Sequence, residues 1–425
     1  MMSKYKKMAV ACVLSLLIII GLCIPTRHAK AETLGQRIPT FGLYCQDQEV
    51  IKSGAVKFDL SDSELFSKNR AIKESEYRVS GNQTVTFEIP FFSSYIEIPQ
   101  FNVTVGGLAI EGEVWYGDNE VRYGGNNSYL DPTSTDNSIL EQQLKKTYSP
   151  ILDETVIGTL YTVIPEADDI TVSLKLEKPC SFVYDGTNLR TESYSADGTQ
   201  VWIYENALSQ PSYQYFFVGE NAVIDFSTTC EYQTEAITFK DFIDRNYNKS
   251  KEFYEQAGAP IGCLYANANR LLQNGGGMKY SELFYDSLGR FGLNTYKFNV
   301  PLNDEVAIRY STEVVIQVNN RYDPPVYVVG QKQLNSYATD YSITLNSKVP
   351  YIVQSSVKTK KDGETYKADS TENFYFMCRS EANGLGLSQT QLIVCIVCGI
   401  VGGIALIVLG VNIGFIIRDK KRSKR

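Results

Sequence analysis

The chain has 425 residues, a formal net charge of −7 and a single histidine, His28. Because a typical domain runs roughly 100–200 residues, we expect two folded modules in addition to targeting segments. An imidazole confined to the N-terminal segment leaves the rest of the chain without the base of a Ser-His-Asp or Cys-His site and without histidine ligands for zinc. The catalytic groups that remain possible are paired carboxylates or a Ser-Lys dyad, and the other possibility is that the protein is not an enzyme.

Residues 1–31 have the pattern of a secretory signal peptide. Three lysines within the first seven residues precede an apolar run over 8–24, and Ala29-Lys30-Ala31 then offers the small residues that signal peptidase prefers. We expect cleavage before Glu32. The apolar run is long for a signal, so an uncleaved N-terminal anchor is the alternative, and both interpretations export the central region.

A second apolar segment, 392–417, predicts one transmembrane helix, since Asn412 is its only strongly polar residue. Its 26 residues would extend roughly 39 Å as a helix, more than the ~30 Å hydrocarbon layer. The tail over 418–425 is basic, and such clusters stay on the cytoplasmic side. The predicted location is therefore the cell membrane, single-pass, with the bulk of the chain extracellular and the C-terminus cytoplasmic.

The region between these segments is strongly acidic. Residues 32–417 contain 30 Lys plus Arg and 47 Asp plus Glu, a net charge of −17. A nucleic-acid binder carries a basic surface, so we expect no nucleic-acid partner. The charge itself favours solubility outside the cell.

Five cysteines lie in the outer region: Cys45, Cys180, Cys230, Cys263 and Cys378. Their odd number and wide spacing allow one or two disulfides and leave at least one thiol over or paired between chains. The spacing matches no zinc motif. The sequence assigns no catalytic residue, no metal ligand and no cofactor-binding residue.

Strand patterns dominate residues 32–235, which we expect to form a β-rich module. Thr84–Ile89 alternates apolar and polar residues and meets Pro90, where we expect the strand to end. Residues 101–105 and 108–115 flank Gly106-Gly107, which predicts a hairpin. A short helix is expected near 138–147. Regular turns between short strands are typical of an antiparallel sandwich or barrel.

The pattern becomes helical over 236–290, where Thr238 and Asp241 resemble a capping pair. Strands return over 291–379 as a second β-rich module, and 380–391 is a linker to the membrane. The predicted fold class is mainly β (α+β), with antiparallel sandwich-like modules, an intervening helical segment and one C-terminal transmembrane helix.

Four glycines of the membrane segment define a candidate helix-association face: Gly399, Gly403, Gly410 and Gly414. At about 100° per residue they lie within about 60° of one another on a helical wheel. The 399/403 and 410/414 pairs have the small-xxx-small spacing that lets two helices approach closely. Self-association or pairing with another membrane subunit is the functional interpretation. The ordinary interpretation is that glycine is simply common in membrane helices.

Aromatic residues are abundant, with 29 tyrosines and 20 phenylalanines. Clusters at 213–217 and 374–376 would supply stacking surfaces for sugars or anchors for proteins, or else pack between strands. The predicted function is a membrane-anchored cell-surface or envelope protein with a non-enzymatic binding or adhesion ectodomain for a protein or glycan ligand. The alternatives are an extracytoplasmic glycan hydrolase using two carboxylates and an accessory subunit of a membrane complex.

Overall fold

The computed structural model describes residues 40–117, 138–166, 168–186, 188–206, 210–319, 325–332, 334, 339–345, 351–370 and 373–379, with 396, 410, 411 and 414. The predicted signal peptide, linker and basic tail lie outside this part of the chain, as does most of 392–417. No helix formed by the described residues is both long enough and apolar enough to span a bilayer.

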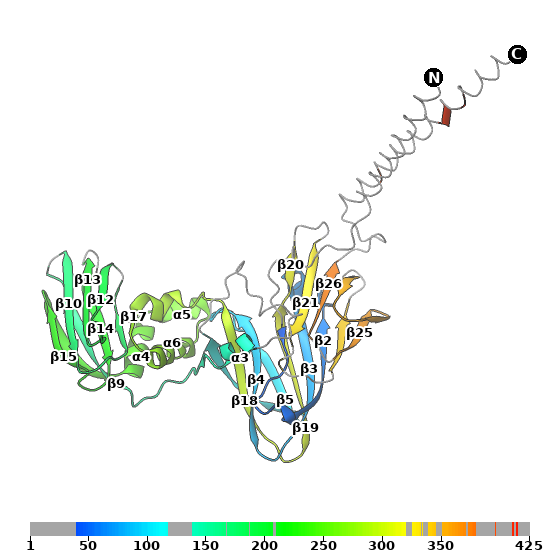
Figure 1. The fold of residues 1–425 in the computed structure, drawn as a ribbon, viewed down its shortest axis with the longest axis horizontal. Helices are drawn as coiled ribbons and strands as arrows, with labels where there is room; N and C mark the ends of the chain where they lie inside the picture. The colour runs from blue at the N-terminus through cyan, green and yellow to red at the C-terminus, as the bar shows by residue number, and fades with distance from the viewer. Residues whose placement is uncertain are drawn as a thin grey trace.

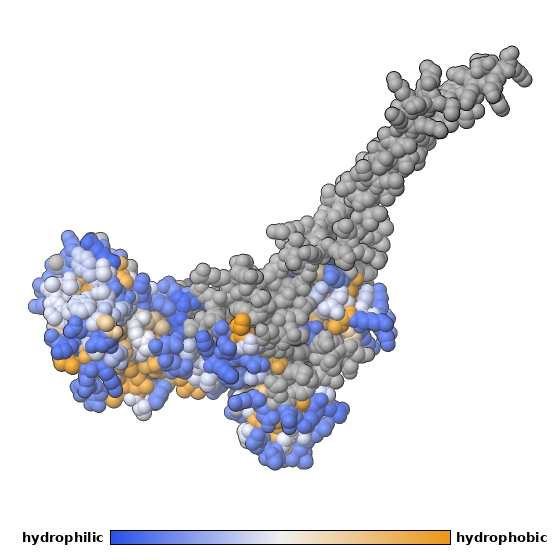
Figure 2. Space-filling view, in the orientation of Figure 1, coloured by the Kyte–Doolittle hydropathy of each residue, from blue (hydrophilic) through white to orange (hydrophobic). Residues whose placement is uncertain are grey.

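The expectation of a mainly β protein with several sheets is confirmed. The described strands form five sheets, and Figure 1 shows them gathered in two lobes with helices between them. We call the lobe made by strands within 40–117, 147–148 and 292–379 the split lobe, and the lobe within 152–290 the inserted lobe. Hydrophilic residues cover most of the visible described surface of both lobes (Figure 2).

The largest sheet of the split lobe has eight strands, all antiparallel to their neighbours except β2 and β22, which run parallel. Its order is β24 (Lys360–Asp362), β25 (Thr365–Ser370), β22 (Thr339–Thr344), β2 (Ile51–Asp59), β3 (Arg70–Ser80), β19 (Glu305–Val315), β5 (Phe101–Val105) and β6 (Leu108–Ile110).

Two further sheets enclose its core. One has the order β1 (Thr40–Phe41), β21 (Val326–Lys332), β26 (Phe374–Arg379) and β23 (Tyr351–Ser355), with β20 (Gln317–Asn319) also on β21; the other has the order β4 (Thr84–Ser93), β18 (Gly292–Pro301), β7 (Glu113–Gly117) and β8 (Thr147–Tyr148). Phe58 of β2 meets Phe374 of β26 across this core at a ring separation of 6.0 Å, and Phe87 and Phe298 are a cross-strand pair of β4 and β18 at 5.9 Å.

The split lobe draws its strands from both ends of the chain. Strand β3 pairs with β19 from Arg70 opposite Val315 to Ser80 opposite Glu305, and β4 pairs with β18 over the full length of both strands. The order of strand and helix patterns along the sequence predicts two separate β modules, over 32–235 and 291–379, on either side of the helical segment. The ladders instead join them into one lobe, because alternation marks a strand but does not identify its partner.

Two local expectations around β4 and β5 had different outcomes. The hairpin at Gly106-Gly107 is confirmed: both glycines have positive φ, 59° and 89°, as a tight two-residue turn requires. Strand β4, however, continues through Pro90 to Ser93. Glu88 exchanges both backbone hydrogen bonds with Tyr44 on the side away from β18. Pro90, two residues on, also directs its nitrogen away from β18, so its missing N–H costs no bond of that ladder.

The inserted lobe is a stack of two sheets and one helical layer. The sheets have the orders β12 (Leu189–Tyr194), β13 (Gln200–Asn206), β10 (Asp169–Leu176), β15 (Val223–Thr228), and β16 (Glu231–Thr238), β9 (Ile157–Ile164), β14 (Tyr213–Val218), β11 (Phe182–Tyr184), β17 (Gly277–Lys279). Tyr161 stacks on Phe226 between the sheets, at 4.0 Å between ring centroids. On the other face of β14, Phe216 stacks on Phe239 and Phe242 of the helical layer.

The described helices are short, and η2 and α2 lie outside the segments where the sequence predicts helices. They are η2 (Gln48–Val50), α2 (Ser63–Ser67), α3 (Ser138–Leu144), α4 (Phe239–Lys249), α5 (Lys251–Ala257), α6 (Ile261–Asn274) and the π-helix η4 (Glu282–Asp286). The expected capping pair starts α4, since the Asp241 amide donates to Thr238 Oγ1 at 2.9 Å. The helix expected near 138–147 is α3, with Leu140 and Leu144 buried.

Replacing Phe298 with alanine tests the ladder between the chain ends. Phe298 is 3% exposed on β18 and stacks on Phe87 of β4. We expect the Phe298→Ala variant to lose about 3–5 kcal/mol of unfolding free energy through lost burial and a residual cavity. Denaturant titration measures the loss. Leu108→Ala is the control in the same lobe, because Leu108 is 77% exposed and should change stability by less than about 0.5 kcal/mol.

Candidate functional site

In the inserted lobe, an open groove of about 500 Å³ lies where the sheet that contains β14 meets the helical layer. Polar and aromatic side chains from β14, α4, η4 and their adjoining loops line it. The lining residues are Asp185, Gln210, Pro211, Ser212, Gln214, Asn246, Lys249, Tyr280, Ser281 and Tyr285. Amides, hydroxyls and tyrosine rings predominate, so the groove can both donate and accept hydrogen bonds.

Asn246 anchors the α4 side of the groove. Its side chain is almost fully buried, and its Nδ2 donates to the Phe242 carbonyl at 2.9 Å, one turn earlier in α4. The Oδ1 atom then accepts a hydrogen bond from the Tyr280 hydroxyl at 3.0 Å. The ring of Tyr280 packs on Phe284 at 4.4 Å, so its position is fixed from both ends.

Tyr285 contributes a second, more exposed ring. It lies 36% exposed on η4 and stacks parallel to Tyr254 at 6.3 Å between centroids. Phe253 meets its edge at 5.5 Å, and its hydroxyl lies 3.4 Å from Ser250 Oγ. The ring is therefore held in one orientation while part of its surface stays open to solvent.

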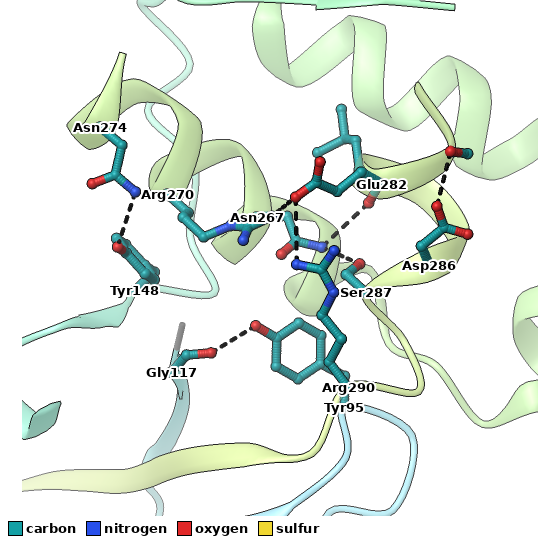
Figure 3. A network of polar contacts seen from close by, with 12 residues as sticks. Tyr95, Gly117, Tyr148, Asn267, Arg270, Asn274, Glu282, Asp286, Ser287 and Arg290 are labelled. Carbon is teal, nitrogen blue, oxygen red and sulfur yellow. Dashed lines mark hydrogen bonds and ion pairs between the residues drawn. The ribbon is translucent and has the colours of Figure 1, made fainter. Parts of the chain in front are cut away.

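A partly buried polar network holds the π-helix that carries Tyr285 (Figure 3). Glu282 Oε1 lies 3.0 Å from Arg270 Nη2 and 3.4 Å from Arg290 Nη1, and joins α6 to the chain leading into β18. Asn267, also on α6, donates from Nδ2 to the Leu283 carbonyl at 3.2 Å. A π-helical turn is unfavourable in isolation and often marks a functional site, so these contacts stabilise a backbone shape that presents the groove residues.

A buried carboxylate lies behind the groove. Glu205 has no exposed surface; its Oε1 accepts from the Gly186 amide at 2.8 Å and its Oε2 from the Tyr215 hydroxyl at 3.0 Å. Burial raises the pKa of Glu205 to about 7, and the neighbouring Asp185 carboxyl adds to the rise. The Gly186 amide, at a turn with φ of 66°, opposes it.

The groove does not present the carboxylate pair of a glycan hydrolase among the described residues. Asp185 is the one carboxylate that lines it, and Glu205 is buried behind it. A retaining or inverting hydrolase needs two carboxyl groups facing each other across the sugar, roughly 5–10 Å apart. The described groups fit hydrogen bonding to hydroxyls and stacking on rings better than acid–base chemistry.

The residues that the sequence singled out are elsewhere. Gly399 and Gly403 lie outside the described residues, whereas Gly410 and Gly414 are helical and an added Cβ at either would meet nothing within 4 Å. The aromatic clusters at 213–217 and 374–376 pack in the two cores, where each aromatic ring is at most 5% exposed. The five described cysteines are free thiols.

The groove residues carried little sequence signal. Asn246 and Tyr280 stood within helical or turn patterns, and neither forms part of a motif with fixed spacing. A polar residue at 246 on the buried face of a helix that is otherwise apolar, with Phe242 and Ile243 before it, was the one available indication.

Comparison with known proteins gives no assignment. No protein-family model matches the chain, and no curated protein matches it. A crystal structure from Legionella pneumophila, named a "putative nutrient binding protein", is similar over 81% of this chain and 70% of its own, with 6% identity and a TM-score of 0.26. A likeness of that degree carries no argument about fold or function.

Glu205→Gln tests the buried carboxyl through the pH dependence of stability. A carboxyl whose pKa is raised from its ordinary 4.5 to about 7 holds its proton more tightly in the folded state. The unfolding free energy of the native chain should therefore fall as pH rises between about 4.5 and 7, by up to about 3 kcal/mol. The variant should flatten this fall in denaturant titrations, whereas Glu231→Gln, at an exposed position of β16, should leave it intact. An unchanged slope in Glu205→Gln would contradict the assignment.

Proposed function

We propose that the chain is a non-enzymatic binding protein whose inserted lobe holds a glycan in the groove between β14, α4 and η4. The observation that supports this most directly is the pairing of the Tyr280 hydroxyl, held in place by the buried Asn246, with the partly open ring of Tyr285. Sugars offer hydroxyls to the first and C–H faces to the second.

The remaining lining groups suit the same ligand. Gln210 and Gln214 add amides, Ser212 and Ser281 add hydroxyls, and Asp185 and Lys249 add one charge of each sign. An amide or hydroxyl can donate or accept, which matches a sugar hydroxyl that does both. The open form of the groove fits a segment of a chain better than an enclosed single molecule.

We propose further that this binding region is displayed at the cell surface. The support is the sequence pattern alone: a signal peptide over 1–31, a single membrane helix over 392–417 and a basic tail that stays in the cytoplasm. The protein would then be integral to the membrane, single-pass, with both lobes extracellular.

The glycine face gives this anchoring proposal a test. Gly403→Ile with Gly410→Ile should weaken self-association or pairing of the membrane segment, because the added side chains keep two helices apart. A membrane two-hybrid assay measures the association. The matched control changes Val401 and Val408 to isoleucine, away from the glycine face. Unchanged association in the glycine variant would remove this face from the proposal.

The groove is tested by binding to a panel of surface oligosaccharides. Tyr285→Ala should weaken binding of any oligosaccharide that the native chain retains, by roughly threefold to tenfold, since ring contacts contribute about 0.5–1.5 kcal/mol beyond area burial. Tyr232→Ala is the control, because Tyr232 is 44% exposed on β16 and does not line the groove.

Two results would overturn the proposal. If Tyr285→Ala and Tyr232→Ala bind alike, or the native chain retains no oligosaccharide, the groove is not a glycan site. If the native chain shortens an oligosaccharide and Asp185→Asn does not, the hydrolase alternative replaces binding.

A further inference from the structure

The split lobe contains a small, partly open cavity that shares no residue with the groove. It offers about 100 Å³ to the centres of water molecules. Strands β1, β3, β4 and β19 wall it, together with the loop that leads to β5. Five phenylalanines contribute to the wall: Phe92 lies 5.4 Å from Phe41 and 6.0 Å from Phe291, and Phe91 lies 5.0 Å from Phe101.

A lysine lies at the base of this aromatic wall. Lys73 occupies an inward position of β3, is 2% exposed and lines the cavity. Its Nζ donates to the Phe41 carbonyl, and it lies 5.4 Å from the centre of the Tyr310 ring. An ammonium carries three N–H donors, and among the described residues the Phe41 carbonyl is its one hydrogen-bond acceptor.

The other charges around the cavity do not neutralise Lys73. Arg70 Nη1 is paired with Glu313 Oε2 at 3.0 Å, and Glu97 is exposed at the rim. Burial is the cause that lowers the pKa of Lys73 to about 7, with no carboxylate raising it. A buried cation without a counter-charge is costly, and an anion entering the cavity would supply that charge.

We propose that this cavity binds a small apolar monocarboxylate, with its carboxylate on the Lys73 ammonium and its ring or short hydrocarbon among the phenylalanines. At about 100 Å³ the cavity is smaller than the engineered apolar cavity of about 150 Å³ that accommodates benzene, so the hydrocarbon of a benzoate-sized ligand extends toward the open rim at Glu97. The site is independent of the glycan groove, because the two lie in different lobes and share no residue.

Charge pairing makes the binding depend on pH. The carboxylate requires the protonated amine, so above pH 7 each ligand that binds must be accompanied by uptake of a proton. The Kd should then rise with pH, by up to about tenfold per unit. Groups facing Lys73 do not reverse this trend: Arg70 and Glu313 are paired with each other, and Tyr310 is a fully buried phenol whose pKa burial raises.

Isothermal titration of the full chain with benzoate tests the proposal, with benzyl alcohol as the uncharged probe. We expect benzoate to bind more tightly than benzyl alcohol at pH 6.5 and to lose affinity between pH 7 and 9. Lys73→Met should weaken benzoate binding at least tenfold while leaving benzyl alcohol unchanged. Lys57→Met, at a solvent-facing position of the same sheet beside Glu74, should bind benzoate like the native chain.

The proposal fails if benzoate does not bind, if benzoate and benzyl alcohol bind alike, or if a folded Lys73→Met variant keeps the native affinity. Circular dichroism establishes folding of the variant. Should that variant not fold, the two-probe comparison and the pH profile of the native chain still decide the matter. Oligosaccharide binding is measured separately, so its failure and failure of this site are distinguishable.

Discussion

The pairing of strands from the two ends of the chain is the constraint on which the rest of the structure depends. Paired residues of β3 and β19 are more than 220 positions apart in the chain, from Glu305 opposite Ser80 to Val315 opposite Arg70. Those of β4 and β18 are 199 to 217 positions apart, from Gly292 opposite Ser93 to Pro301 opposite Thr84. These ladders form the walls of the Lys73 cavity and also fix where residues between them leave and rejoin the lobe. Without them neither the cavity nor the position of the inserted lobe would be defined.

The two candidate sites use opposite physical strategies. The groove on the inserted lobe is open and polar, and its side chains are positioned by hydrogen bonds such as that between Tyr280 and Asn246. The cavity of the split lobe is small and lined mostly by apolar side chains, and its buried amine lies in a medium that penalises charge. The first suits a ligand rich in hydroxyls and the second a small apolar anion.

Local structure was largely predictable from the sequence, and pairing was not. The glycine turn after β5 and the Thr238 cap of α4 were predicted because turn and cap chemistry is local. Which strands meet depends on burial across the whole lobe, which no short pattern records. Pro90 misled the prediction because its effect depends on which side of β4 the partner lies.

In the two candidate sites, too, local features could be predicted from the sequence and contacts between distant residues could not. Residues 71, 73, 75, 77 and 79 of β3 face inward, and an alternating pattern reveals that parity. What the pattern cannot reveal is that the Lys73 amine ends beside the Phe41 carbonyl, supplied by a strand 32 residues earlier. For the groove, the sequence shows that tyrosines are abundant but not which of them are exposed. The aromatic clusters at 213–217 and 374–376, which looked like candidate binding surfaces, are buried in the cores of the two lobes.

The split lobe also imposes an order on synthesis. A ribosome delivers the N-terminal strands of this lobe first, yet their partners β18 and β19 emerge only after the whole inserted lobe has been made. The inserted lobe holds all the strands of its own sheets and can fold in the interval, since domains generally fold as units during synthesis. The early strands must meanwhile wait with open edges, and that period is when the nascent chain is most exposed to aggregation and to chaperones.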